Sequence, residues 1–158
     1  MELDEVFKVL AACGRELVEY VLIGGAALNF HGLVRATEDI DLFVRPTSEN
    51  IARLRRALWS VYSDPSIDEI SAEDLSGDYP VIRYSPPNGE LFLDILGRIG
   101  EFAKYDDLKA QEIEISGVTI RVATPSCLYW LKKGTLRAID RADAQALREK
   151  FDLSDLEE

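Results

Sequence analysis

Two aspartates lie one residue apart in the otherwise apolar segment 39–44. Side chains of a β-strand point alternately to its two faces, so a strand here would hold Asp39 and Asp41 on one face and Ile40 and Leu42 on the other. Two carboxylates at this spacing raise each other's pKa unless a cation or hydrogen bonds compensate. Because carboxylate oxygens are hard ligands that suit Mg²⁺ or Mn²⁺, the pair predicts a divalent-metal site.

A third carboxylate, that of Asp94, interrupts the apolar segment 90–96. Burying an unpaired charge costs roughly several kcal/mol, so Asp94 requires a partner. A metal ion shared with Asp39 and Asp41 would supply one. The alternative is an aspartate at the end of a strand, facing solvent. We expect all three aspartates to be metal ligands.

A pair of glycines, Gly24-Gly25, follows the apolar run 20–23. The run contains β-branched and aromatic residues and stops at glycine, which predicts a buried strand. Glycine permits a sharp turn and a close approach of a ligand to the main chain. Residues 26–30 are expected to form a short helix whose free N–H groups suit a phosphate. The alternative is an ordinary strand-to-helix turn, because a complete phosphate-binding fingerprint needs more fixed positions.

The order of these pieces resembles the DNA polymerase beta-like nucleotidyltransferase superfamily, and most of all its small bacterial members related to AbiEii-type abortive-infection toxins. The specific part of the resemblance is the string Arg35-x-Thr37-x-Asp39-Ile40-Asp41-Leu42. The weaker matches, spread over residues 20–147, are Gly24-Gly25, His31-Gly32, Asp94, Lys132, Arg137, Asp140 and Asp143. Many superfamily members have Gly-Ser where this chain has Gly24-Gly25, so a hydroxyl that could contact phosphate is missing.

The resemblance implies an α+β (α/β) nucleotidyltransferase fold, with a mixed β-sheet flanked by helices. It also implies a metal-dependent enzyme that moves a nucleoside monophosphate group from an NTP to a hydroxyl acceptor, using Mg²⁺ or Mn²⁺. The expected catalytic residues and metal ligands are Asp39, Asp41 and Asp94, and the expected nucleotide-binding residues are Gly24, Gly25, Arg35, Thr37 and Lys132.

The acceptor implied by the resemblance is RNA, a protein side chain or a small molecule. The protein would then be a candidate toxin of a toxin–antitoxin system, with a cognate antitoxin or toxin as partner. A noncatalytic nucleotide-binding or antitoxin-like protein that retains the same fold is the alternative. Three acidic residues argue against that alternative, whereas the missing serine and the small size of the chain allow it.

The composition is that of one globular domain, expected to span residues 1–158: hydrophobic residues make up 47% of the chain and charged residues 30%. No apolar stretch approaches the ~20 residues needed to cross a bilayer, so we expect no membrane partner. Three of the first five residues are acidic, whereas the start of a signal peptide is basic. Cys13 and Cys127 are isolated, with neither metal-ligand spacing nor a disulfide framework. These features predict a cytoplasmic location.

The net charge of −11 opposes nonspecific binding of DNA or RNA. Positive charge is concentrated in two clusters, one formed by Arg53, Arg55 and Arg56 and the other by Lys132, Lys133, Arg137 and Arg141. We expect the first cluster to be a solvated helix face. In the second cluster, the resemblance implies that Lys132 contacts the triphosphate of the nucleotide, with Lys133 as the second candidate. Alternatively, the positive charges of both lysines could simply stabilise the C-terminal end of a helix. His31 is expected to cap a helix rather than act as a base.

Apolar periodicity predicts a helix over residues 4–17 and a second helix opened by Thr47 or Ser48, with Ile51, Leu54, Leu58 and Val61 buried. Residues 63–78 are predicted to be a loop with at most one helical turn. Strands are expected over 80–84 and 90–96, a hairpin around Ser116-Gly117, and a helix with Pro125 at its first position. This strand–helix–strand start followed by hairpins predicts a mixed sheet with helices on it.

Overall fold

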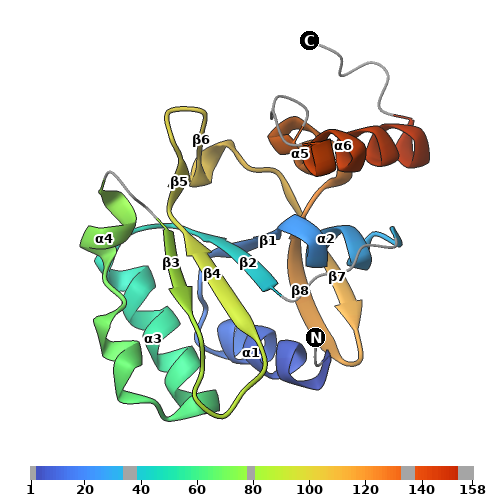
Figure 1. The fold of residues 1–158 in the computed structure, drawn as a ribbon. Helices are drawn as coiled ribbons and strands as arrows, with labels where there is room; N and C mark the ends of the chain where they lie inside the picture. Colours follow the sequence, from blue (N-terminus) through green and yellow to red (C-terminus); the bar gives the residue numbers. More distant parts are fainter. Residues whose placement is uncertain (1–2, 34–38, 78–80, 133–137, 153–158) are drawn as a thin grey trace.

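The computed structural model describes residues 3–33, 39–77, 81–132 and 138–152 (Figure 1). The helices are α1 (Leu3–Arg15), α2 (Gly24–Phe30), α3 (Ser48–Tyr62), α4 (Ala72–Ser76), α5 (Pro125–Lys132) and α6 (Ala138–Phe151), with 3₁₀ turns η1 (Pro65–Glu69) and η2 (Tyr105–Asp107). The strands are β1 (Tyr20–Ile23), β2 (Asp39–Val44), β3 (Val81–Tyr84), β4 (Phe92–Leu96), β5 (Arg98–Ile99), β6 (Ala103–Lys104), β7 (Ala110–Ile115) and β8 (Val118–Ala123).

A six-stranded sheet in the order β3-β4-β2-β1-β8-β7 forms the centre of the molecule. β2 lies parallel to β4 and β1 lies parallel to β8, whereas the other neighbouring pairs are antiparallel. In Figure 1, α1 and α3 lie side by side below the sheet, and α5 and α6 lie side by side above it. The predicted mixed sheet flanked by helices is therefore confirmed. No helix in the described part of the chain combines the length and apolarity needed to span a bilayer.

The strand–helix–strand start does not form the usual parallel unit, because β1 and β2 are antiparallel, with Tyr20 opposite Val44 and Ile23 opposite Asp41. The connecting helix α2 has seven residues and is only about 10 Å long. The two parallel pairs instead join segments that are distant in the sequence.

Several local predictions are confirmed and two are wrong. Strand β1, strand β2, the β7–β8 hairpin and the start of α5 at Pro125 match the expectation. Helix α1, however, ends at Arg15, and Leu17 has a positive φ of 58° and a side chain that is 71% exposed. The segment 63–78 contains η1 and α4 rather than an open loop, because Asp64 and Ser71 cap these turns and Ile67 and Leu75 are buried.

Helix α3 begins as predicted, with Thr47 as the N-cap whose hydroxyl accepts a hydrogen bond from the backbone N–H of Asn50. Its apolar stripe is buried at Ile51, Leu54 and Leu58 and partly buried at Val61. Its three arginines make structural contacts: Arg53 pairs with Glu49, Arg56 pairs with Glu16, and Arg55 donates to the carbonyl of Ile70. This first positive cluster therefore belongs to the scaffold.

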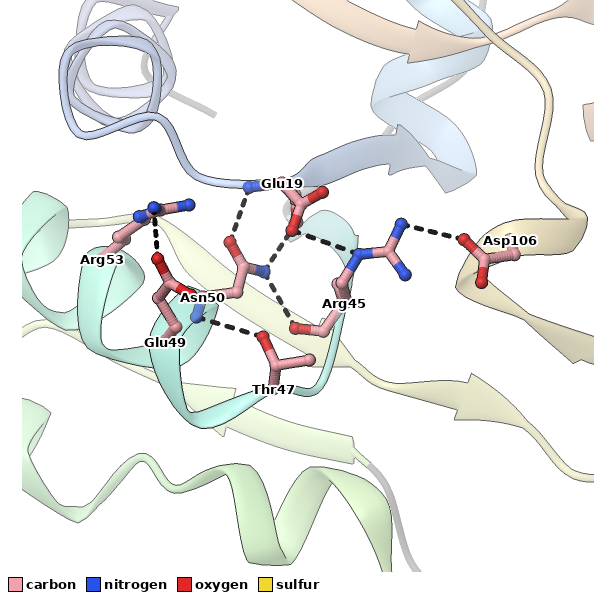
Figure 2. A network of polar contacts seen from close by, with 7 residues as sticks. All are labelled: Glu19, Arg45, Thr47, Glu49, Asn50, Arg53 and Asp106. Atoms are coloured by element: carbon pink, nitrogen blue, oxygen red, sulfur yellow. Dashed lines mark hydrogen bonds and ion pairs between the residues drawn. The ribbon is translucent and has the colours of Figure 1, made fainter.

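One buried side-chain amide, that of Asn50, ties α3 to β1 and β2 (Figure 2). Its Oδ1 accepts from the backbone N–H of Glu19 at 2.7 Å. Its Nδ2 donates to the carbonyls of Glu19 and Arg45, at 2.9 Å each. Glu19 directly precedes β1 and Arg45 directly follows β2. The amide thus holds together the ends of the two strands whose other ends reach the acidic residues.

Candidate active site

Arg83, Asp94 and Asp41 form one row across three neighbouring strands, because Arg83 of β3 pairs with Asp94 of β4, and Asp94 pairs with Asp41 of β2. Residues that pair directly on adjacent strands point to the same face of the sheet. Asp39 lies two residues before Asp41 and opposite Phe92, so both belong to this face as well. The parallel pairing of β2 with β4 therefore brings together the three aspartates predicted as site residues.

The guanidinium of Arg83 binds two of the three carboxylates. Its Nε donates to Oδ1 of Asp94 at 2.8 Å, and its Nη2 donates to Oδ2 of Asp94 at 3.0 Å and to Oδ2 of Asp39 at 2.9 Å. The same group lies 5.3 Å from the centre of the Phe92 ring. Hydrogen bonding to Asp94, followed by the charges of Asp94 and Asp39, raises the pKa of Arg83.

The sequence prediction missed Arg83. Strand alternation around residue 83 could have indicated only that Arg83 points to the face opposite to that of Ile82 and Tyr84. However, β3 and β4 are joined by a turn, and only their register shows that Arg83 lies opposite Asp94 rather than one residue away.

The surroundings of Asp41 favour the protonated form of its carboxyl group. Burial, then the charge of Asp94 and a hydrogen bond with it, and then the charge of Asp39 raise the pKa of Asp41 to about 7. The positive charge of Lys132 acts in the opposite direction. Near neutral pH, Asp41 therefore carries a proton for much of the time, as expected where like charges converge in a poorly solvated place.

Gly24 makes room for the Asp41 side chain. It is the first residue of α2 and has a φ of +75°, a backbone conformation that residues with side chains rarely adopt. A Cβ atom at this position would overlap with Oδ2 of Asp41. The carboxylate of Asp41 thus requires glycine at position 24. The sequence prediction explained this glycine only by a sharp turn and by phosphate binding. Helix α2 also begins at Gly24, two residues before the predicted start.

Lys132, the last residue of α5, lies close enough to Asp41 to influence its ionisation. Its Nζ is 3.4 Å from Oδ2 of Asp143 on α6, and the two side chains are only 13% and 11% exposed. The C-terminal helices therefore bring a cation to the acidic face of the sheet. Asp140 belongs to α6, whereas Arg35, Thr37, Lys133 and Arg137 lie outside the described residues.

His31 follows the last residue of α2, at the helix end where it was predicted to act as a cap. Its Nε2 lies 2.8 Å from the carbonyl oxygen of Ala123, at the end of β8, and therefore donates a hydrogen bond. The imidazole also packs edge-on against the ring of Phe151, with 5.8 Å between ring centres. These contacts give His31 a structural place between α2, β8 and α6.

In the part of the chain that the structure describes, no three His, Cys, Asp or Glu side chains are arranged to hold a metal ion. The predicted metal ligands share one face of the sheet, but Arg83 engages both oxygens of Asp94 and one oxygen of Asp39. The chemistry of the donor set nevertheless fits Mg²⁺ or Mn²⁺, because it offers several carboxylate oxygens and already attracts a cationic side chain.

A hollow of about 660 Å³ lies elsewhere, between α1, α3 and the β7–β8 turn. Its lining residues include Phe7, Lys8, Arg15 and Ser60, and none of the three aspartates belongs to it. We assign the site from the acidic row and not from this hollow, because the hollow contains no comparable grouping of reactive side chains.

Comparison with known proteins identifies the family. Residues 9–147 match the model of a family described as the nucleotidyl transferase AbiEii toxin of type IV toxin–antitoxin systems. The chain belongs to the AbiEii family. It is therefore a nucleotidyltransferase, which confirms both the predicted family and the predicted class of enzyme. No curated protein sequence matches the chain.

Two solved structures share the fold of this AbiEii-family protein. The crystal structure of ANT(2")-Ia in complex with adenylyl-2"-tobramycin is 14% identical, with a TM-score of 0.58, over 96% of this chain and 90% of that chain. An antigenic nucleotidyltransferase-like protein from Paracoccidioides brasiliensis is 15% identical, with a TM-score of 0.54, over 91% and 76% of the two chains. At this level of identity the likeness establishes the nucleotidyltransferase fold alone.

Lys132 could bind phosphate, stabilise the fold through its ion pair with Asp143, or do both, and a substitution tests each role. Lys132→Ala should weaken NTP binding by about 1.5–3 kcal/mol through loss of a charge-assisted contact. It should also lower the free energy of unfolding by about 2 kcal/mol, because the nearly buried carboxylate of Asp143 loses a cationic partner. Titration calorimetry and urea unfolding measure the two effects.

Asp143→Asn is the matched control, since it removes the same ion pair but leaves the positive charge of Lys132 in place. This variant should lose stability without losing NTP affinity. Wild-type NTP affinity in Lys132→Ala would mean that the phosphates are held elsewhere, for which Arg35 and the glycine pair are the remaining candidates.

Proposed function

We propose that this AbiEii-family protein, acting as a single domain over residues 1–158, transfers a nucleoside monophosphate from an NTP to a hydroxyl acceptor. The observation that supports this most strongly is the convergence of Asp39, Asp41 and Asp94 on one face of the sheet. Burial of Asp41, together with the negative charges of Asp94 and Asp39, raises the pKa of Asp41 to about 7. A protein that retains such a destabilising cluster has it for a function rather than for stability.

Asp39, Asp41 and Asp94 would be the ligands of Mg²⁺ or Mn²⁺. When bound, the cation would neutralise phosphate charge and favour ionisation of the acceptor hydroxyl. The acceptor oxygen forms a bond to the α-phosphorus, and the bond between that phosphorus and the bridging oxygen of pyrophosphate breaks. A carboxylate oxygen of Asp94 receives the hydroxyl proton, and pyrophosphate leaves with the electron pair of the broken bond.

The triphosphate would be bound beside this face by two kinds of groups. The main chain of Gly24 and Gly25 would supply N–H donors, and Lys132 approaches from α5 with a positive charge. Arg35 and Thr37 complete the proposed nucleotide site on the basis of the sequence motif alone. Together these groups would orient the α-phosphorus toward the acceptor and offset the charge that accumulates on the leaving pyrophosphate.

The acceptor is a hydroxyl of RNA, a protein side chain or a small molecule. Membership of a type IV toxin–antitoxin family supports a role as the toxin, with a cognate antitoxin as partner. The adenylylated tobramycin bound to ANT(2")-Ia illustrates that this fold accommodates a hydroxyl acceptor. The net charge of −11 favours an acceptor bound by local contacts rather than by nonspecific attraction of a polyanion.

Metal and NTP together should stabilise the protein against heat. With either Mg²⁺ or Mn²⁺, the correct NTP at a hundredfold excess over its Kd should stabilise the fold by about 3 kcal/mol, because ligand binds only the folded state. The same NTP with EDTA should have little effect. The melting curve is measured with each of the four common NTPs, and α-³²P-labelled NTP is incubated with protein and cell extract to detect the labelled acceptor. Unchanged melting with every NTP and both metals would contradict the proposed site.

A further inference from the structure

Arg83 has no role so far in the proposed metal site or nucleotide site, although it contacts two of the proposed metal ligands. It projects from β3, the edge strand of the six-stranded sheet, and its side chain is 53% exposed. Its guanidinium donates hydrogen bonds to both oxygens of Asp94 and to one oxygen of Asp39, at 2.8–3.0 Å. The guanidinium also lies over the Phe92 ring. These three neighbours belong to the proposed active site or border it.

The carboxylate oxygens held by Arg83 are those that a divalent cation requires. Arg83 occupies one side of both oxygens of Asp94. A divalent cation bound to the same carboxylate would repel the positively charged guanidinium, so the two cations compete for Asp94. A guanidinium fork matches the geometry of carboxylate and phosphate equally well, because both acceptors offer two oxygens to two parallel N–H groups. Once Arg83 is displaced from Asp94, the phosphates of a bound nucleotide are the chemically equivalent acceptors on the same face.

We propose that Arg83 is an additional active-site residue with two alternative partners: it holds Asp39 and Asp94 in the metal-free protein and binds the phosphates of the nucleotide once these carboxylates hold a divalent cation. This proposal rests on the proposed function. Exposure of the side chain and its position on an edge strand give the guanidinium room to move without disturbing the core. The first set of contacts also keeps two like-charged carboxylates close together before metal arrives.

A purely structural role would give different behaviour. If Arg83 served only the scaffold, its replacement could change stability but should have no effect on the binding of metal or nucleotide. If Arg83 alternates between the carboxylates and the phosphates, it should weaken binding of the metal and strengthen binding of the nucleotide. Its removal should strengthen binding of the metal alone, because competition ends, and weaken binding of the nucleotide, because a phosphate contact is lost.

The test uses the full-length chain and the variants Arg83→Gln and Arg83→Lys. Mn²⁺ binding without nucleotide is followed by the electron paramagnetic resonance signal of free Mn²⁺, and binding of each common NTP is then measured by calorimetry at saturating Mg²⁺. Arg83→Gln should bind Mn²⁺ about tenfold more tightly, which corresponds to an arginine that occupies the carboxylates for about nine-tenths of the time. It should bind the preferred NTP about tenfold more weakly.

Arg83→Lys retains the charge but not the fork, so both effects should be intermediate. It also serves if the glutamine variant fails to fold. The matched control is Arg53→Gln, which removes a partly exposed arginine paired with Glu49 on α3, away from the acidic face, and should bind both ligands like wild type.

The outcomes distinguish this proposal from the proposed function. If wild type binds Mn²⁺ and NTP, but the Arg83 variants bind Mn²⁺ no more tightly or NTP no more weakly, Arg83 has no second partner, whereas the metal site stands. If neither wild type nor variants bind Mn²⁺, both proposals fail. Binding of Mn²⁺ by Arg83→Gln alone would support the competition directly.

Discussion

Asp41→Asn should abolish nucleotidyl transfer and, at the same time, stabilise the metal-free protein. We expect transfer to fall by about 10³-fold or more, because one of three carboxylates required around the reacting phosphate is replaced by a neutral amide. The fold should persist, since the amide has nearly the same shape and relieves repulsion from Asp94 and Asp39. Transfer assays and urea unfolding in EDTA measure the two effects.

The gain in stability should depend on pH. Folding raises the pKa of Asp41 from 3.8 to about 7, so the folded protein keeps a proton that the unfolded chain has lost in this range. Wild-type stability therefore falls as pH rises from about 4 to about 7, and above pH 7 the whole penalty is present. The asparagine variant lacks this penalty. Its advantage over wild type should grow by about 2 kcal/mol between pH 5 and pH 8.

Asp68→Asn is the control for both measurements, because it removes an exposed aspartate of η1 and should leave transfer and stability near wild type. If Asp41→Asn instead unfolds the domain, the carboxylate is a structural hydrogen-bonding group and the assignment of Asp41 to the site is wrong. If transfer persists at the wild-type rate, the acidic row is not the catalytic centre.

Asn50→Ala should produce the largest loss of stability among the variants considered. The alanine leaves three backbone groups near the ends of β1 and β2 without their partner: the N–H and carbonyl of Glu19 and the carbonyl of Arg45. Each buried polar group left unpaired costs about 1–3 kcal/mol, and water entering the space recovers part of that cost. We expect a decrease of about 3 kcal/mol in the free energy of unfolding, measured in urea.

A second variant at the same position identifies the groups responsible. Asn50→Asp keeps the size and the acceptor for Glu19, but its carboxylate cannot donate to the two carbonyls, so it should be destabilising as well. Asn88→Ala, at an exposed turn position, is the control and should change stability by less than about 0.5 kcal/mol. A loss below about 1 kcal/mol in both Asn50 variants would show that this network contributes little to holding the strands together.

The sequence by itself was sufficient for features that depend on neighbouring residues. Alternation placed Asp39 and Asp41 on one face of β2, the Thr47 cap marked the start of α3, and Pro125 marked the start of α5. These signals are local, because strand periodicity, capping and the fixed φ of proline act within one or two turns of chain. The string from Arg35 to Leu42, in order with Gly24-Gly25 and Asp94, also indicated the nucleotidyltransferase family, which the match over residues 9–147 confirms.

The composition of the site was decided by the tertiary structure. Arg83, Asp94 and Asp41 form a row only because β4 lies between β3 and β2 in one particular register, and a shift by one residue would turn Asp94 to the opposite face. The need for glycine at position 24 arises from Asp41 on another strand, and the partner of Lys132 lies on another helix. Register and strand order are set by burying the apolar faces of distant segments against α1 and α3, and no local pattern contains that information. β2 runs antiparallel to β1 and parallel to β4, and this pairing of segments that are distant in the sequence brings Asp41 beside Asp94.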